Sequence, residues 1–205
     1  GTSPEEPGKV ETVPEGSRKA VEIVPLDPSI MTFALQGILP YGEGQLDEAD
    51  SVRVLNAMMY CGAVDQSEDL QVTKTPISTE SGLDYATETY NGDELIRVIA
   101  YRNSDGINFR QRIYFKDGEI VYFRMRYLDK RPGREKLDEF YAFAESGEIF
   151  KVLSRSSEMN TGEKTSSERI RSLKLMSAHD RLDEYKEKVR KAWADISNAI
   201  EDGKN

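Results

Sequence analysis

The amino-acid sequence predicts an α+β domain, in which an antiparallel β-meander of about six strands packs against N-terminal helices and a long C-terminal helix. Between residues 84 and 155, apolar and polar residues alternate with the period of two that is typical of β-strands. Short turn signals interrupt this pattern at regular intervals, which favours antiparallel pairing of successive strands. Beyond residue 181, apolar residues recur every three or four positions, as on one face of a helix.

Length and composition indicate one folded domain with a tail. The chain has 205 residues, of which 38% are hydrophobic and 32% are charged, and this is enough apolar material for a single core. Residues 1–17 contain three prolines and four glutamates but few side chains to bury. We therefore expect a disordered tail or tether at 1–17 and a single α+β domain at 18–205.

The charge balance and the scarcity of cysteine and histidine argue against several partners and sites. The formal net charge is −9, from 37 acidic and 28 basic residues, so the chain repels phosphate backbones and we expect no nucleic-acid partner. Cys61 and His179 are the only residues of their kinds. They allow no internal disulfide and no cysteine-based zinc site. We expect neither a metal nor a cofactor.

Membrane and export signals are not evident in the sequence. No apolar run reaches the length of a transmembrane helix, and no segment has the pattern of a signal peptide. The start of the chain, GTSPEEPGKVETVPEGS, is compatible with a leader removed from a longer precursor. We therefore expect no transmembrane segment and leave open a lipid anchor upstream of residue 1.

The N-terminal part is predicted to hold one strand and two helices. The segment RKAVEIV at 18–24 favours a strand. The Asp-Pro pair at 27–28 suits the N-cap and first turn of a short helix that Gly37 ends. A second helix is predicted at 47–61, with Gly62 at its end. The stripe expected on its buried face consists of Val52, Leu55, Met58 and Met59.

Six predicted strands follow, separated by turns that contain glycine. Asn-Gly and Asp-Gly between alternating runs are strong hairpin signals, because both central residues adopt positive φ. Turn signals lie at Asn91-Gly92, Ser104-Asp105-Gly106, Asp117-Gly118, Pro132-Gly133 and Ser146-Gly147. The predicted strands are 84–90, 93–102, 107–116, 119–128, 136–145 and 148–155.

The last segment is predicted to be an amphipathic helix with Ser177 as its N-cap. Its outer face carries favourable pairs of opposite charge, such as Glu184 with Lys188. The sequence leaves open whether 169–176 forms a helix or a strand. The residues expected to pack on the sheet are Tyr185, Val189, Trp193 and Ile196.

The stretch RQRIYFKDGEIVYFRMRY at 110–127 is predicted to be a hairpin with a two-residue turn at Asp117-Gly118. In this register Ile113 faces Tyr122 across the two strands. Each face of the hairpin then mixes apolar and charged residues, whereas a sheet covered on one side alternates cleanly. We therefore expect the C-terminal helix to cover one face of the sheet in part and the N-terminal helices to cover the other.

Four arginines stand at the end of this hairpin away from the turn. Strict alternation places Arg110 and Arg112 on one face, and Arg124 and Arg126 on the other. Guanidinium forks match planar anions and aromatic rings stack beside them. We predict that Arg112, Tyr122, Arg124 and Arg126 bind a ligand, which is an anionic small molecule, a glycan or a protein. The alternative is cross-strand pairing with the acids Glu88, Asp138 and Glu139.

No catalytic residues are predicted. Ser177, His179 and Asp180 lie within one helical turn, whereas a triad needs three groups that converge in space. Cys61 ends an apolar helix face, so we expect it to be buried rather than nucleophilic. The acidic segment at 46–50 lacks the spaced oxygen ligands of a calcium loop and is interpreted as the start of a helix.

Three segments carry a family resemblance: RIYFKDGEIVYF at 112–123, EFYAFAESGEIFKVLSRS at 139–156 and the charged helix DEYKEKVRKAWADI at 183–196. Together they resemble a loosely defined group of uncharacterised exported proteins and lipoproteins of Bacteroidetes. That group repeats a Tyr-Tyr-Phe, turn and Gly pattern before a Glu/Lys-rich helix, and the similarity covers about 85–201. The resemblance implies a location in the cell envelope, periplasmic or surface-exposed, and supplies no catalytic residues.

These observations predict a non-enzymatic envelope protein, similar to secreted or periplasmic lipoproteins, that binds or scaffolds through its sheet. Two alternatives stay open. One is a carboxylate-based hydrolase acting on glycans, which a deep cleft with two convergent acids would favour. The other is a cytosolic interaction module, which a precursor without a signal peptide would favour.

Overall fold

The computed structural model describes residues 19–27, 48–77, 82–158 and 175–205. These residues contain one open antiparallel sheet of eight strands, in which each strand pairs with its neighbours in the sequence. The α+β class and the meander predicted from the sequence are therefore confirmed. The strands are β1 (Gln71–Pro76), β2 (Tyr85–Asn91), β3 (Glu94–Ser104), β4 (Ile107–Lys116), β5 (Glu119–Asp129), β6 (Lys136–Glu145), β7 (Glu148–Glu158) and β8 (Met176–Ser177).

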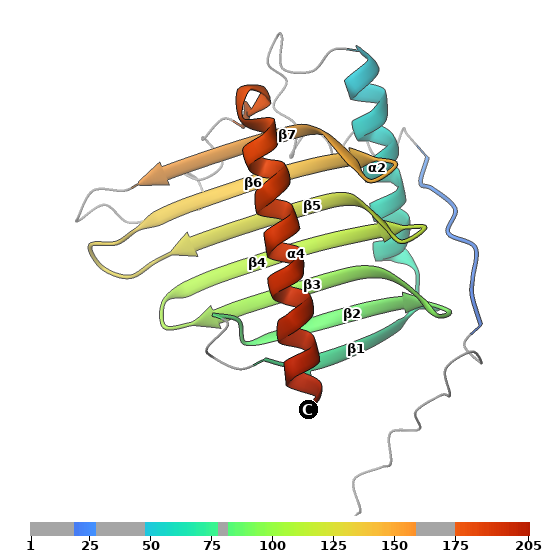
Figure 1. Cartoon of the computed structure of the whole chain (residues 1–205), viewed down its shortest axis with the longest axis horizontal. Helices are drawn as coiled ribbons and strands as arrows, with labels where there is room; N and C mark the ends of the chain where they lie inside the picture. Colours follow the sequence, from blue (N-terminus) through green and yellow to red (C-terminus); the bar gives the residue numbers. More distant parts are fainter. Residues whose placement is uncertain (1–18, 28–47, 78–81, 159–174) are drawn as a thin grey trace, which may run out of the picture.

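A helix covers each face of this sheet, as the mixed faces of the hairpin predict. Helix α4 (Leu182–Lys204), which follows the short 3-10 helix η2 (His179–Arg181), crosses the strands on one side (Figure 1). Helix α2 (Glu48–Gln66) lies on the other side, near the end of the sheet where β4 turns into β5 and β6 turns into β7 (Figure 1). Each side has its own apolar cluster, the first around Phe123 and Phe140 under α4, the second around Tyr114 and Phe143 under α2.

The strands predicted between 84 and 155 agree with β2 to β7 to within a few residues. The prediction of about six strands falls short of eight because β1 and β8 carry little periodic signal. In β1, QVTKTP, only Thr75 is buried, so no alternation of apolar residues marks the strand. The edge strand β8 contains only two residues and begins at Met176. The sequence leaves open whether 169–176 is a helix or a strand, and in the structure the last residue of that segment belongs to a strand.

The strand predicted at 18–24 is wrong over its described part, because residues 19–27 form no regular secondary structure. The backbone groups of this segment form hydrogen bonds with a side chain and with a helix carbonyl, and not with a neighbouring strand. Val21 donates its N–H to Asn91 Oδ1 at 2.8 Å, and its carbonyl accepts from Asn91 Nδ2 at 2.7 Å. Leu26 N–H donates to the Met59 carbonyl at 3.2 Å. The predicted tail at 1–17 and the helix predicted from 28 to 37 lie outside the described residues.

Helix α2 confirms the predicted second helix but continues past Gly62 to Gln66. It continues because Ala63 and Val64, 8% and 1% exposed, extend its buried face. The predicted stripe is wrong in part: Met58 is buried, whereas Val52 is 54% exposed. The helix is rotated so that its buried residues are Val54, Ala57, Met58, Tyr60, Cys61, Ala63 and Val64.

Helix α4 buries Tyr185, Val189 and Ile196 as predicted, while Trp193 is only half-buried. The indole of Trp193 lies against Phe115 of β4, with ring centroids 5.0 Å apart. Ser177 is not the N-cap, because it pairs with Leu153 within the sheet. The N-cap residue of α4 is Arg181, which makes no side-chain capping hydrogen bond.

The hairpin of β4 and β5 contains a β-bulge that strict alternation does not predict. Its two turn residues adopt positive φ as expected, 52° at Asp117 and 78° at Gly118. The register then shifts between Phe115 and Tyr114, so that Tyr114 pairs with Tyr122. The predicted pairing of Ile113 with Tyr122 is therefore wrong. Val121 is the extra residue, and every residue of β5 beyond it faces the opposite side from the one predicted.

Candidate functional site

Because of this bulge, all four arginines of the hairpin lie on the side of the sheet that α2 occupies. Arg112 pairs with Arg124 in the register, and Arg110 pairs with Arg126. The two pairs border a cavity of about 270 Å³, which we call the arginine pocket. Its lining consists of Asn108, Arg110, Arg112, Arg124, Arg126, Leu128 and Lys130.

Helix α2 does not cover the four arginines, because it is held over the other end of the β4–β5 hairpin, next to the turn at Asp117-Gly118. The Tyr60 hydroxyl of α2 donates to the Phe115 carbonyl at 2.5 Å. At the other end of the helix, Asp65 accepts hydrogen bonds from the Tyr114 hydroxyl at 2.7 Å and from Arg97 Nη1 at 2.7 Å. The helix therefore buries Tyr114 and Tyr122, and the arginine pocket begins at the next pair on the same face of β4 and β5, Arg112 with Arg124.

The charge of the arginine pocket is strongly unbalanced. Five of its lining side chains are cationic and no carboxylate lines it. Within the described part of the chain, Arg110, Arg112 and Arg126 form no ion pair, and the Nε atoms of Arg112 and Arg126 are buried without a hydrogen-bond partner. Like charges directly opposite each other destabilise an antiparallel pair. The arrangement therefore presents donors that an anion would satisfy.

Beside the pocket, one buried carboxylate anchors part of this cluster. Glu139 of β6 is fully buried, and it accepts hydrogen bonds from Arg124 Nη2 at 3.0 Å and from Arg155 Nε at 2.6 Å. The Tyr141 hydroxyl also donates to Glu139 Oε1, at 2.5 Å. A single carboxylate is thus shared by two guanidinium groups and a phenol, and it fixes the position of Arg124.

The protonation states at this anchor follow from its contacts. Burial alone would raise the pKa of Glu139, but the hydrogen bond from Tyr141 and the charge of Arg155 hold that pKa below its usual range. Burial would lower the pKa of Arg124, and Tyr141, Tyr122 and Glu139 together keep it above its ordinary value. Burial raises the pKa of Tyr141 to about 12. At neutral pH the carboxylate is therefore ionised, the guanidinium is charged and the phenol is a donor.

A row of stacked side chains leads to the pocket from the other edge of the sheet. The Tyr85 and Tyr101 rings of β2 and β3 stack with centroids 4.7 Å apart. Lys74 of β1 lies 4.1 Å from the Tyr85 centroid, and the Arg110 guanidinium lies 5.1 Å from the Tyr101 centroid. Since both faces of this tyrosine pair are already covered by cations, we interpret the row as a support that orients Arg110.

The structure brings together three of the four predicted ligand-binding residues. Arg112, Arg124 and Arg126 line the arginine pocket, whereas Tyr122 is only 4% exposed and packs under α2. The predicted site missed Arg110, and also Asn108 and Lys130. Arg110 has a detectable signal, because it stands two residues before Arg112 and therefore on the same face of the strand.

Of the three acids predicted as alternative partners of the arginines, only one pairs with an arginine of the hairpin. Glu139 does pair with Arg124, so cross-strand pairing accounts for one of the arginines. Glu88 instead lies near Lys204 of α4, 3.2 Å from its Nζ, on the other side of the sheet. Asp138 precedes Glu139 on β6 and therefore also faces the α4 side.

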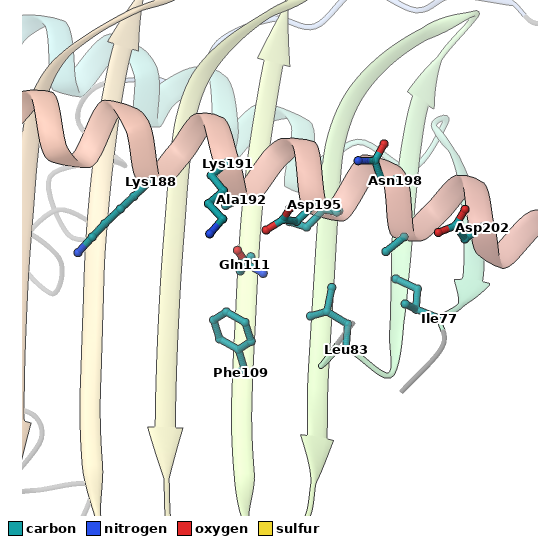
Figure 2. Close-up of a pocket in the computed structure, with 12 residues that line it drawn as sticks. Ile77, Leu83, Phe109, Gln111, Lys188, Lys191, Ala192, Asp195, Asn198 and Asp202 are labelled. Atoms are coloured by element: carbon teal, nitrogen blue, oxygen red, sulfur yellow. The ribbon is translucent and has the colours of Figure 1, made fainter. Parts of the chain in front are cut away.

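A larger cavity, of about 630 Å³, lies on the α4 side between the helix and the sheet. Figure 2 shows Ile77, Leu83 and Phe109 on its sheet wall and charged side chains along the flank of α4. Those charges are mixed, because Lys188 and Lys191 are followed along the helix by aspartates at 195 and 202. The groove therefore has an apolar floor but no single sign of charge to select a ligand.

A third cavity, of about 280 Å³, lies where the N-terminal half of α2 meets two hairpin turns. Asp117, Glu119 and Glu145 line it together with Arg53 and Lys116. Arg53 Nε lies 3.3 Å from Glu145 Oε2, so one of the acids is already paired. In the described ranges, no three His, Cys, Asp or Glu side chains are arranged to hold a metal ion.

The two reactive residue types singled out in the sequence lie away from these cavities. Cys61 is 4% exposed in the α2 cluster, as predicted, and burial raises the pKa of its thiol. His179 is exposed in η2. Neither residue lines the arginine pocket.

Comparison with known proteins gives no relative: no family model, curated protein or solved structure matches this chain. Among the helices that the structure describes, none is both long and apolar enough to cross a membrane.

Proposed function

We propose that this chain is a non-enzymatic binding protein that holds an anionic ligand in the arginine pocket. The observation that carries the proposal is the pairing of Arg110 with Arg126 and of Arg112 with Arg124 on one face of the sheet. Arginines so arranged repel one another unless an anion lies between them. Among the described residues, the one carboxylate that forms an ion pair with any of the four, Glu139, is already shared with Arg155.

The distribution of carboxylates favours this binding role over the alternative of a glycan hydrolase. Glycosidases need two carboxyl groups about 5–9.5 Å apart across a cleft. The acids of the α4 groove, Asp195 and Asp202, are seven residues apart on one helix and so are separated by about 10 Å along its axis. In the turn cavity, Arg53 engages Glu145.

We further propose a location in the cell envelope, periplasmic or surface-exposed, with a lipid anchor before residue 1 as one route of attachment. This part of the proposal rests on the resemblance of residues 85–201 to exported proteins and lipoproteins. Fractionation of cells that express the natural precursor tests it. Recovery from the cytosol alone would support the interaction-module alternative.

The binding proposal is tested by calorimetric titration of the wild type and of Arg112→Gln/Arg126→Gln with phosphate, citrate and a panel of acidic glycans at low ionic strength. We expect the wild type to bind at least one of these anions and the double variant to bind it at least about tenfold more weakly, since each charged hydrogen bond contributes about 1.5–3 kcal/mol. Arg190→Gln, a surface arginine of α4 paired with Glu187, is the matched control. Equal binding by the double variant rejects the proposal, and so does a wild type that binds neither these anions nor any other anion tested below.

A further inference from the structure

We propose that the ligand of the arginine pocket carries a diphosphate group, so that one phosphoryl group meets the Arg110–Arg126 pair and the other meets the Arg112–Arg124 pair. This inference rests on the proposed anion-binding function and goes further in naming the chemistry of the ligand. It follows from the spacing of the two pairs, from their charge and from the size of the cavity.

The spacing of the arginines favours two adjacent anionic groups over one. The two pairs are two residues apart along β4 and β5, so their Cα atoms are separated by roughly 7 Å along the strands. Within each pair, the two backbones lie about 5 Å apart. Each guanidinium offers a planar fork that matches a tetrahedral oxyanion. One small oxyanion between the forks of one pair would leave at least one arginine of the other pair without an anion, because among the described residues Arg124 is the only one of the four with a carboxylate partner.

The charge of the pocket favours phosphoryl groups over carboxylates. Arg110, Arg112, Arg126 and Lys130 form no ion pair with a carboxylate of the described chain, and Arg124 shares Glu139 with Arg155. A dicarboxylate brings two negative charges to this cluster. A diphosphate ester brings about three at neutral pH, since its terminal phosphoryl group carries about −1.5 to −2 and its inner group about −1, and it holds them in a smaller volume.

The size and exposure of the pocket suit a head group at the end of a larger molecule. Its volume of about 270 Å³ is just below the about 300 Å³ at which pockets for whole drug-sized ligands begin. Arg110 and Lys130 are exposed, whereas Arg112 and Arg126 are partly buried. The terminal phosphoryl group would therefore lie at the more buried Arg112–Arg124 pair and the inner one at the Arg110–Arg126 pair, and any group esterified to the diphosphate would remain on the side of Arg110 and Lys130.

The test is calorimetric titration of the full chain with phosphate, diphosphate, methylenediphosphonate, succinate and a nucleoside diphosphate. Ionic strength is matched with sodium chloride, and divalent cations are left out because they bind diphosphate. We expect diphosphate and methylenediphosphonate to bind at least about tenfold more tightly than phosphate or succinate, because they engage the second arginine pair. Retained affinity for the nucleoside diphosphate would identify an esterified source, and its loss a free diphosphate.

Variants separate the two proposals. Arg112→Lys keeps the charge but removes the fork, and we expect it to weaken diphosphate binding several-fold while changing phosphate binding less. Arg190→Gln is the control and is expected to change neither affinity. If phosphate and diphosphate bind equally well, or succinate binds more tightly, the diphosphate inference is wrong while anion binding stands. If none of these anions nor any in the glycan panel binds, both proposals are wrong.

Discussion

Arg112 of β4 and Arg124 of β5 stand directly opposite each other in the register, and both lie on the α2 side of the sheet. Arg124 Nη2 donates to Glu139, whereas the buried Nε of Arg112 has no partner among the described residues. Two like charges in this position cost an antiparallel pair roughly 0.2–1 kcal/mol. The protein without its anion is therefore less stable than its backbone and core would allow.

The first prediction is that removing one of these charges stabilises the folded state. We expect Arg112→Gln to raise the free energy of unfolding by about 0.2–1 kcal/mol in low salt, measured by urea denaturation. The gain should shrink in 1 M sodium chloride, where screening weakens the repulsion. Arg190→Gln, which breaks an exposed ion pair with Glu187, should give no such gain. A loss of stability in Arg112→Gln would reveal a structural role for this arginine.

The second prediction concerns the buried carboxylate. Glu139→Gln leaves Arg124 and Arg155 without their shared charge, and their side chains are 31% and 16% exposed. Breaking a buried pair costs about 3–5 kcal/mol, and partial access of water to both arginines lowers our expectation to about 2–4 kcal/mol. Urea denaturation at pH 7 measures this loss. Glu145→Gln, an exposed acid paired with Arg53, is the control and should cost less.

The third prediction is the pH dependence of the same interaction. The folded-state pKa of Glu139 lies below its ordinary value of 4.5. Its charge therefore contributes stability above that value, and the contribution is lost as the pH falls through the folded pKa. The difference in unfolding free energy between wild type and Glu139→Gln should be constant from pH 7 to about 5 and decrease at lower pH. A difference that grows on acidification would contradict the direction of the shift.

The fourth prediction concerns Trp193 of α4. The sequence alone predicts that Trp193 is buried, and full burial would make Trp193→Ala lower the free energy of unfolding by about 3–5 kcal/mol. Because the indole is half-buried against Phe115, we expect about 2–3 kcal/mol, together with tryptophan emission between the buried and solvated limits. Lys191→Ala, an exposed position on the same helix, should change stability little. Emission like that of free tryptophan, without destabilisation, would argue against this packing.

The fifth prediction tests the attachment of α2. Tyr60→Phe removes the hydrogen bond to the Phe115 carbonyl and leaves that acceptor unpaired by the helix, so we expect a loss of about 1–2 kcal/mol. Tyr101→Phe is a suitable control, because no hydrogen bond of its hydroxyl is seen within the described ranges and its stack with Tyr85 is kept. Equal effects of the two variants would mean that the Tyr60 bond adds nothing to stability.

Turn chemistry made most of the sheet predictable. Asp105, Asp117 and Ser146 adopt positive φ before Gly106, Gly118 and Gly147, and these tight turns join β3 to β4, β4 to β5 and β6 to β7. In such turns the local sequence determines the backbone, so strand limits follow from it. The edge strand β1 was missed for the converse reason: its backbone pairs with β2, but its side chains are mostly exposed.

The sequence predicted that the candidate site lies on the β4–β5 hairpin, but it did not predict which side chains of the hairpin share one face. The run Ile120-Val121-Tyr122-Phe123 is apolar throughout, so no alternation reveals which residue is the extra one. The bulge at Val121 moves Arg124 and Arg126 to the face of Arg110 and Arg112, and it turns Tyr122 under α2. The role of Glu139 also depends on that shift, because Arg124 would otherwise point away from it.

The order in which the chain is synthesised has a consequence for its apolar surfaces. Neighbouring strands pair with each other, so each hairpin of the sheet closes as soon as it leaves the ribosome, and such local contacts form quickly. Helix α4 is the exception. It reaches back to the first strand, where Gly203 approaches the Pro76 carbonyl. Until α4 emerges, the face around Phe123 and Phe140 stays open to water, and an exposed apolar face of this kind favours aggregation of the nascent chain.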